Sequence, residues 1–237
     1  MTSADRLIVA LDGENFKMTQ LMQQLYHELN IKNFKVSPSL ILEEAWNRDL
    51  PGLVWNLTQY PDTGLFLDLK LYDTRDTIER TVKMAFDLGA RFVTVHATQS
   101  VMEAAMRAKP ADERCKVLAV PGLTDAVGSG PFIESLNVTD GIVCDVGVAA
   151  HLRTASLTET IYHERYAKKT LVCPGIRQIG SDGYYAPKDN HSRVYCPAEA
   201  LRAGADYLIV GRPIWQAEDP AKAAKAIIAE MNESTLT

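Results

Sequence analysis

The sequence predicts an α/β fold in which eight parallel strands close into a TIM (β/α)8 barrel, formed by a single domain over residues 1–237. Short apolar runs alternate with amphipathic helical stretches from end to end, and the runs are rich in Val, Ile and Leu. Nearly continuous hydrophobicity is typical of parallel strands that are covered on both faces. Eight such units in 237 residues match the size of a compact barrel. The alternative is a doubly wound open sheet, but no glycine-rich G-x-G-x-x-G loop follows the first strand.

The expected strands share an apolar run and a polar or glycine-containing end. In chain order they are Arg6–Asp12, Asn33–Ser37, Leu65–Leu71, Phe92–Ala97, Val117–Gly122, Gly141–Val146, Thr170–Ile176 and Tyr207–Gly211. Between them, helical periodicity marks Thr74–Leu88, Val101–Ala108 and Pro220–Met231. Leu-Gly-Ala before Arg91 and Ala-Gly-Ala before Asp206 are typical of helix C-caps that lead into a strand. The long polar stretch Gln178–Ser192 predicts a functional loop, such as a lid.

Composition excludes several classes of function. The net charge of −5 and the absence of a block of like charge argue against a nucleic-acid surface. No run of eighteen apolar residues predicts a membrane span, and the first residues lead straight into a strand rather than a signal peptide. The cysteines are widely spaced, so we expect reduced thiols that pack as small hydrophobic residues. We therefore expect a cytoplasmic protein.

The stretch from Leu65 to Asp73 is a predicted buried strand that carries charges. Side chains alternate faces along a strand, so Asp68 and Lys70 should project to the same side and pair. Asp73 has the opposite parity, which predicts a position just past the strand, on a loop. A purely structural ion pair is the alternative interpretation, because a buried acid and base are costly unless they pair.

Further charged residues stand at other predicted strand ends, where TIM barrels place their catalytic groups. They are Asp12, Lys35, His96, Arg177 and Arg212. Singly, each has a structural explanation, and His96 alone is best explained as a hydrogen-bonded histidine. Together they predict one pocket of three carboxylates and two ammonium groups. The two lysines would repel a divalent ion, so we expect no metal.

The loops after the seventh and eighth strands predict a phosphate site, as in many TIM barrels. They read Pro174-Gly-Ile-Arg177 and Val210-Gly211-Arg212-Pro213. Glycine lets backbone N–H groups approach an anion, and Arg212 adds a charged planar fork. We therefore expect a phosphate monoester substrate, with its reacting end across the barrel at Lys70.

These segments together resemble the orotidine 5′-phosphate decarboxylase family over nearly the whole chain. The matching motifs are Leu7-Ile-Val-Ala-Leu-Asp12, Phe34-Lys-Val-Ser37, Phe66-Leu-Asp-Leu-Lys-Leu-Tyr-Asp73, Val93-Thr-Val-His-Ala97, Cys173-Pro-Gly-Ile-Arg177 and Ala203-Gly-Ala-Asp-Tyr-Leu-Ile-Val-Gly-Arg-Pro-Ile214. The resemblance implies decarboxylation of orotidine 5′-monophosphate without a cofactor, by a homodimer with shared sites.

The resemblance also implies roles for individual residues. Lys35, Asp68, Lys70 and Asp73 correspond to the charged catalytic array, and Lys70 would protonate the carbanion. For substrate binding, it implies that Asp12 joins Lys35 at the ribose, that Arg212 binds phosphate, and that Thr77 enters from the neighbouring subunit. The other expected substrate-binding residues are His96, Thr124 near the base, Arg177, His191 and Gly211.

Two departures from the family pattern leave the substrate open. The chain reads Thr74-Arg75-Asp76-Thr77 where the family commonly has Ile-Pro-Asn-Thr, and it lacks the glutamine of the family's phosphate loop, which Asn190 or His191 would replace. The main alternative is a related decarboxylase acting on another nucleotide or on a sugar phosphate such as 3-keto-L-gulonate 6-phosphate. Those sugar-phosphate enzymes hold magnesium with an acid at the position of Lys35. A catalytically silent barrel is the remaining alternative.

Overall fold

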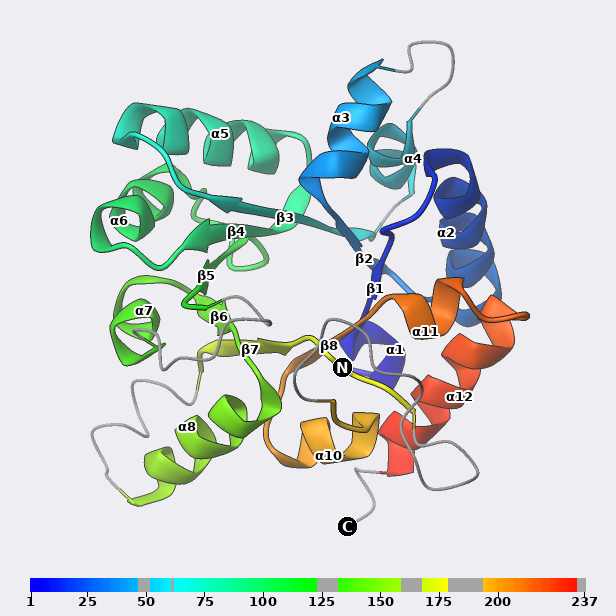
Figure 1. Cartoon of the computed structure of the whole chain (residues 1–237). Coiled ribbons are helices and arrows are strands. Elements are labelled where there is room, and N and C mark those ends of the chain that lie inside the picture. The colour runs from blue at the N-terminus through cyan, green and yellow to red at the C-terminus, as the bar shows by residue number, and fades with distance from the viewer. Residues whose placement is uncertain (47–51, 61, 123–131, 159–167, 179–193, 234–237) are drawn as a thin grey trace.

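The computed structural model describes residues 1–46, 52–60, 62–122, 132–158, 168–178 and 194–233. Its strands form a closed parallel barrel in the order β1 to β8, with helices around it (Figure 1). The strands are β1 Leu7–Ala10, β2 Asn33–Val36, β3 Gly64–Leu71, β4 Ala90–His96, β5 Lys116–Val120, β6 Gly141–Val143, β7 Thr170–Cys173 and β8 Tyr207–Val210. The predicted TIM barrel is therefore confirmed.

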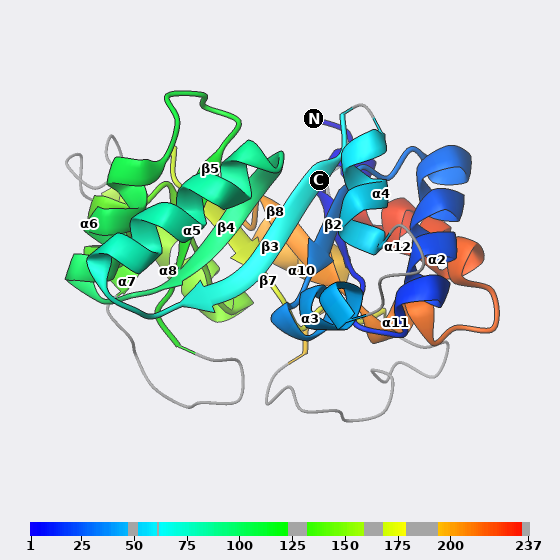
Figure 2. The same cartoon turned by 90° about the horizontal axis from the view of Figure 1, so that it is seen from above.

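Helices follow the strands and cover the outside of the barrel. They are α1 Ser3–Arg6, α2 Asn15–Leu29, α3 Pro38–Trp46, α4 Leu53–Gln59, α5 Arg75–Asp87, α6 Gln99–Ala108, α7 Phe132–Val138, α8 Val146–Thr158, α10 Pro197–Arg202, α11 Arg212–Trp215 and α12 Pro220–Glu233. The N-terminus and α11 lie at opposite ends of the barrel (Figure 2). Among these helices, none is long and apolar enough to cross a membrane.

Alternating strand residues fill the barrel interior. The buried set inside is Ile8, Ala10, Phe66, Phe92, Leu118, Val172, Tyr207 and Ile209. Phe92 is central, because its ring centroid lies 5.4 Å from that of Phe66 and 5.2 Å from that of Tyr207. The residues of opposite parity pack against the helices in a larger outer core. The interior is thus a packed core of side chains rather than an open channel.

Two of the predicted helix ends are confirmed by their glycines. α5 ends at Asp87 and α10 at Arg202. Gly89 and Gly204 follow with φ of 94° and 95°, a backbone region that is strained for residues with a Cβ. Each glycine lets the chain reverse from a helix into the next strand within a few residues.

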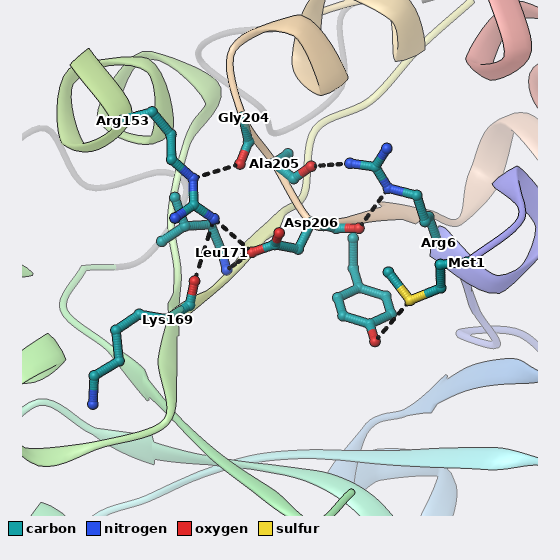
Figure 3. Close-up of polar contacts among 9 residues, drawn as sticks. Met1, Arg6, Arg153, Lys169, Leu171, Gly204, Ala205 and Asp206 are labelled. Atoms are coloured by element: carbon teal, nitrogen blue, oxygen red, sulfur yellow. Dashed lines mark hydrogen bonds and ion pairs between the residues drawn. The ribbon is translucent and has the colours of Figure 1, made fainter. Parts of the chain in front are cut away.

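Polar contacts tie together the chain segments at the N-terminal end of the barrel (Figure 3). The Asp206 carboxylate, just before β8, accepts hydrogen bonds from Arg153 Nη2 and the Leu171 backbone N–H, both at 2.8 Å. Arg153 also donates to the Gly204 carbonyl at 3.2 Å and the Lys169 carbonyl at 3.3 Å. Arg6, at the end of α1, donates to the Asp206 carbonyl at 3.0 Å. These contacts join β1, β7 and β8 at the end opposite α11.

Most of the expected strands are longer than the strands of the structure. Val146 is expected to end the sixth strand, but it begins α8, so that boundary is wrong. β5 ends at Val120, where Pro121 follows without an N–H group to donate to the neighbouring strand. Apolar residues continue past the hydrogen-bonded ladder in both places, and hydrophobicity alone does not show where pairing stops.

The cysteines are free, as predicted. Cys144, Cys173 and Cys196 are buried and Cys115 is partly buried. Burial raises the pKa of the Cys115 thiol, which keeps it protonated and unreactive near neutral pH. These side chains therefore serve as packing residues.

Candidate active site

The third strand is irregular where its charged residues begin. Leu67 pairs with Val93 of β4, and the next pair is Leu71 with Val95. Between these two pairs β3 advances by four residues while β4 advances by two. Lys70 lies in this bulge with a left-handed φ of 47°. For a residue with a side chain this conformation costs about 1–2 kcal/mol, so other contacts must hold it. Bulges of this kind often redirect a side chain next to an active site.

Four of the predicted residues form one chain of alternating charge. Asp12 accepts from Lys35 Nζ at 3.3 Å, and Lys35 Nζ also lies 3.3 Å from Asp68 Oδ2. Lys70 Nζ lies 2.7 Å from the same Asp68 oxygen. The side chains of Lys35 and Asp68 are 9% and 12% exposed, whereas those of Asp12 and Lys70 are both 42% exposed. The chain of charges therefore has a buried centre and two ends that solvent or a ligand can reach.

Asp68 is held as a carboxylate. Burial raises its pKa, but the nearby Lys35 and Lys70 ammonium groups, together with hydrogen bonds from Lys70 and Thr94, outweigh burial and leave the pKa below its ordinary value. A negative charge is thus fixed beside the Lys70 ammonium at neutral pH.

Asp73 and Thr77 lie beyond the end of β3. Asp73 is exposed and off the strand, as predicted, and its carboxylate accepts from the Thr74 backbone N–H at 2.6 Å. Thr77, in the first turn of α5, accepts a hydrogen bond from the Thr74 hydroxyl at 3.1 Å. Three carboxylates were predicted to share one pocket. Those of Asp12 and Asp68 belong to the linked chain of charges, whereas Asp73 is exposed outside it.

His96 is exposed at the end of β4 and is hydrogen-bonded, as the simple interpretation of this histidine predicted. Its Nδ1 lies 2.8 Å from Thr98 Oγ1, and its ring centroid lies 5.0 Å from that of Tyr72. Tyr72 is also exposed and was not among the predicted site residues. In the sequence, the position of Tyr72 within the charged strand motif was the signal that could have pointed to it.

The ends of β7 and β8 carry the predicted anion-binding residues. Arg177 is buried and donates to the Ile176 carbonyl at 2.8 Å. Gly175 has φ of 79°, and Gly211 and Arg212 follow β8 directly, at the start of α11. The predicted residues Thr124 and His191, with Asn190, lie outside the described part of the chain.

Sequence reasoning missed Thr94. This fully buried residue of β4 donates its hydroxyl proton to Asp68 Oδ1 at 2.9 Å and accepts from the Lys70 backbone N–H at 2.9 Å. The available signal was a polar residue in the middle of the apolar run Phe92–Val95, on the same strand face as Phe92.

The arrangement suits chemistry on a developing negative charge. A partly exposed ammonium stands next to a buried carboxylate, and a second, buried ammonium contacts the same carboxylate oxygen. Such a preset group can stabilise a carbanion and give it a proton without moving far. No group of three or more potential metal ligands occurs among the described residues.

Known proteins resemble this chain along almost its full length. The family model "Orotidine 5'-phosphate decarboxylase / HUMPS family" matches residues 5–227. An orotidine 5'-phosphate decarboxylase from Rhodopseudomonas palustris (strain HaA2) is 35% identical, over 97% of this chain and 96% of the relative. One of the same name from Nitrobacter winogradskyi is 36% identical, over 97% and 94%.

Solved structures agree in fold. The orotidine 5'-phosphate decarboxylase from Lactobacillus acidophilus has a TM-score of 0.68 at 24% identity, covering 96% of this chain and 99% of that chain. The enzyme of that name from Pyrococcus horikoshii OT3 has a TM-score of 0.67 at 23% identity, covering 95% and 99%. The strand motifs, the charged chain at the barrel end and these relatives lead to one assignment: the chain belongs to the orotidine 5'-phosphate decarboxylase / HUMPS family.

Proposed function

We propose that the protein decarboxylates orotidine 5′-monophosphate to uridine 5′-monophosphate, a step of pyrimidine synthesis, without a cofactor. The observation that carries the proposal is the alternating chain Asp12–Lys35–Asp68–Lys70 at the C-terminal end of the barrel. The names of its relatives supply the reaction, and the chain of charges supplies groups that fit it.

The chemical step places the substrate carboxylate beside Asp68. In this pose the two negative charges disfavour the bound ground state. The bond from C6 to the carboxylate breaks, CO2 leaves, and the electron pair remains on C6. Lys70 then donates one ammonium proton to C6, and solvent reprotonates its amine, since the Lys70 side chain is 42% exposed. The attraction to Lys70 grows in the transition state, as negative charge develops on C6, and catalysis requires this difference.

The fixed charges reduce the reorganisation that the step demands. Lys35 is almost fully buried and contacts the same Asp68 oxygen as Lys70, so the carboxylate is in place before the substrate arrives. A charge that is already oriented in a site of low dielectric stabilises a transition state at little further cost. Lys35 is therefore proposed as part of the catalytic array, as is Asp73 from a second subunit.

The substrate-binding roles are proposed for the remaining rim residues. Asp12, with Lys35, would hold ribose hydroxyls, because its carboxylate is partly exposed at the end of β1. Arg212 and the Gly211 backbone would hold the phosphate at the end of β8. Asp73 and Thr77 would complete the site of a neighbouring subunit; Asp73 is exposed in its own chain and forms no part of the linked chain of charges.

The base and phosphate ends of the same site are proposed to be lined by His96, Thr124, Arg177 and His191. His96 stands on the rim at the end of β4, next to Tyr72. Arg177 is the buried member, four residues beyond the end of β7.

A magnesium-dependent sugar-phosphate decarboxylase is disfavoured by Lys35. Its ammonium stands between the Asp12 and Asp68 carboxylates, 3.3 Å from each, where those acids would otherwise share a cation. The deciding experiment is a decarboxylation assay with orotidine 5′-monophosphate in EDTA, followed by loss of absorbance of the orotate band. We expect full turnover. Loss of activity on chelation that returns with Mg²⁺, or activity on 3-keto-L-gulonate 6-phosphate alone, would overturn the proposal.

A further inference from the structure

The Thr94 hydroxyl closes a ring of hydrogen bonds through both ends of Lys70. The Lys70 backbone N–H donates to Thr94 Oγ1 at 2.9 Å, and Thr94 donates to Asp68 Oδ1 at 2.9 Å. The other carboxylate oxygen, Oδ2, accepts from Lys70 Nζ at 2.7 Å. The same hydroxyl therefore fixes the backbone from which the ammonium projects and the carboxylate that the ammonium contacts.

The hydroxyl takes the place of a strand hydrogen bond that the bulge removes. Between Leu67 and Leu71 the regular pairing with β4 is interrupted, and Lys70 lies in the interrupted stretch. A buried N–H group requires an acceptor, and a left-handed residue needs support from its surroundings. Thr94 supplies both from the facing strand, where it is fully buried and cannot exchange this role with water.

The direction of the hydrogen bonds follows from the groups themselves. The amide of Lys70 can only donate, and the ionised carboxylate of Asp68 can only accept. Thr94 Oγ1 must therefore accept from the amide and give its single proton to Asp68. A side chain of similar size without a hydroxyl would leave the Lys70 amide without its acceptor and Asp68 Oδ1 without this donor. Such losses are costly for buried polar groups.

We infer that Thr94 is a positioning residue for the reaction, acting through its hydroxyl to hold the left-handed Lys70 and the Asp68 carboxylate in their catalytic arrangement. The inference rests on the proposed function, because it assigns Lys70 and Asp68 their chemical roles. Thr94 acts through these two residues rather than on the substrate. It should therefore affect the chemical step more than substrate binding.

The test compares Thr94→Val with Thr94→Ser. Val keeps the shape of the side chain and removes the hydroxyl, whereas Ser keeps the hydroxyl. We expect Thr94→Val to lower kcat about tenfold or more, the usual scale for loss of a supporting contact, with a much smaller change in KM. Thr94→Ser, which keeps the hydroxyl, should retain most of the wild-type kcat.

A matched control separates positioning from general loss of stability. Thr139 is as buried as Thr94, and its hydroxyl also makes two contacts, with the Ser135 and Gly141 carbonyls at 2.8 Å. It precedes β6, at the opposite end of the barrel from the site. Thr139→Val and Thr94→Val should both lower the midpoint of thermal unfolding, whereas kcat of Thr139→Val should stay near the wild-type value.

A readout that does not need turnover completes the test. The Thr94 hydrogen bond lowers the pKa of Asp68, so Thr94→Val should raise that pKa, and Thr139→Val should not. A ¹³C NMR titration of the Asp carboxyl groups measures this shift. An inactive wild type with the expected NMR shift would overturn the proposed function but support the positioning contact. Folded Thr94→Val with wild-type kcat and an unchanged Asp68 titration would overturn the inference.

Discussion

Lys70 Nζ lies 2.7 Å from Asp68 Oδ2 although the Lys70 backbone is left-handed, with φ of 47°. In a regular strand, Asp68 and Lys70 would also lie on one face, but the lysine would then keep the regular residue-by-residue pairing with β4. The bulge adds two residues to β3 between its pairings with Val93 and Val95. The contact therefore depends on an irregular backbone that its neighbours must support.

Lys70→Ala and Arg212→Ala should separate chemistry from binding. Loss of the proposed proton donor should lower kcat by at least about 10²–10⁴-fold, while binding of uridine 5′-monophosphate persists. Loss of the proposed phosphate contact of Arg212 should weaken binding of this nucleotide by about 1.5–3 kcal/mol. Steady-state kinetics and calorimetric titration of the nucleotide measure the two effects. Near wild-type turnover by Lys70→Ala would remove its assignment as proton donor.

Stability should depend on pH through Asp68. Because its pKa in the folded protein is lowered, the unfolded chain binds more protons as pH falls below about 4. The contribution of the ionised carboxylate is present above the unfolded-state pKa and is lost as pH falls through the folded-state pKa. Asp68→Asn should therefore lose less of its unfolding free energy across this range than the wild type does. Urea unfolding at a series of pH values measures the slopes, and parallel slopes would contradict the prediction.

Lys35→Met should raise the pKa of Asp68, because the Lys35 charge is the largest of the influences that lower it. Turnover should fall as well, since the Asp68 carboxylate loses one of the two ammonium groups that hold it. Lys109→Met is the matched control: this lysine follows α6, is 15% exposed and pairs at 3.3 Å with Asp140, which directly precedes β6 at the far end of the barrel. In the control, the NMR titration of the Asp68 carboxyl group and kcat should both be unchanged. A shift of the Asp68 titration in Lys109→Met but not in Lys35→Met would refute the assignment.

Asp206→Ala should weaken the fold without changing the chemistry. Its carboxylate satisfies both Arg153 and the Leu171 N–H at the N-terminal end of the barrel (Figure 3). Removal leaves two donors without this acceptor and should lower the free energy of unfolding by about 1–3 kcal/mol. Asp112→Ala, which breaks an exposed pair with Arg114, should cost much less, because an exposed ion pair contributes little to stability. Denaturant unfolding and kcat of both variants are the measurements, and a large drop in kcat for folded Asp206→Ala would count against this view.

Two inactive variants should complement each other if the site is shared between two subunits. Asp73 is exposed beyond the end of β3, and in the proposed dimer it would enter the site of the second copy of the chain. In a heterodimer of Asp73→Ala and Lys70→Ala, one of the two sites would contain both intact residues. Mixing the two proteins under conditions of subunit exchange should therefore restore part of the activity. Heterodimers confirmed by native mass spectrometry that remain inactive would place Asp73 in the site of its own subunit.

The sequence by itself determined the fold class and most of the charged residues of the site. The alternation of apolar strand runs with helical periodicity predicted the barrel, because parallel strands covered on both faces must be apolar throughout. Charged residues inside or just after such runs are conspicuous for the same reason. Asp12, Lys35, Asp68 and Lys70 therefore stand out in the sequence alone, and three ion pairs link them in the fold.

Only the tertiary structure decided how these groups are held. The bulge at Lys70 arises from pairing with β4, and no local pattern in β3 specifies a pairing with a strand that begins at Ala90. Thr94 was missed for the same reason: its role exists only when β3 and β4 lie side by side. Strand ends such as Val146 were also misplaced, since hydrophobicity continues beyond the last ladder hydrogen bond. Composition and periodicity are properties of the chain, whereas register and hydrogen-bond partners belong to segments brought together by folding.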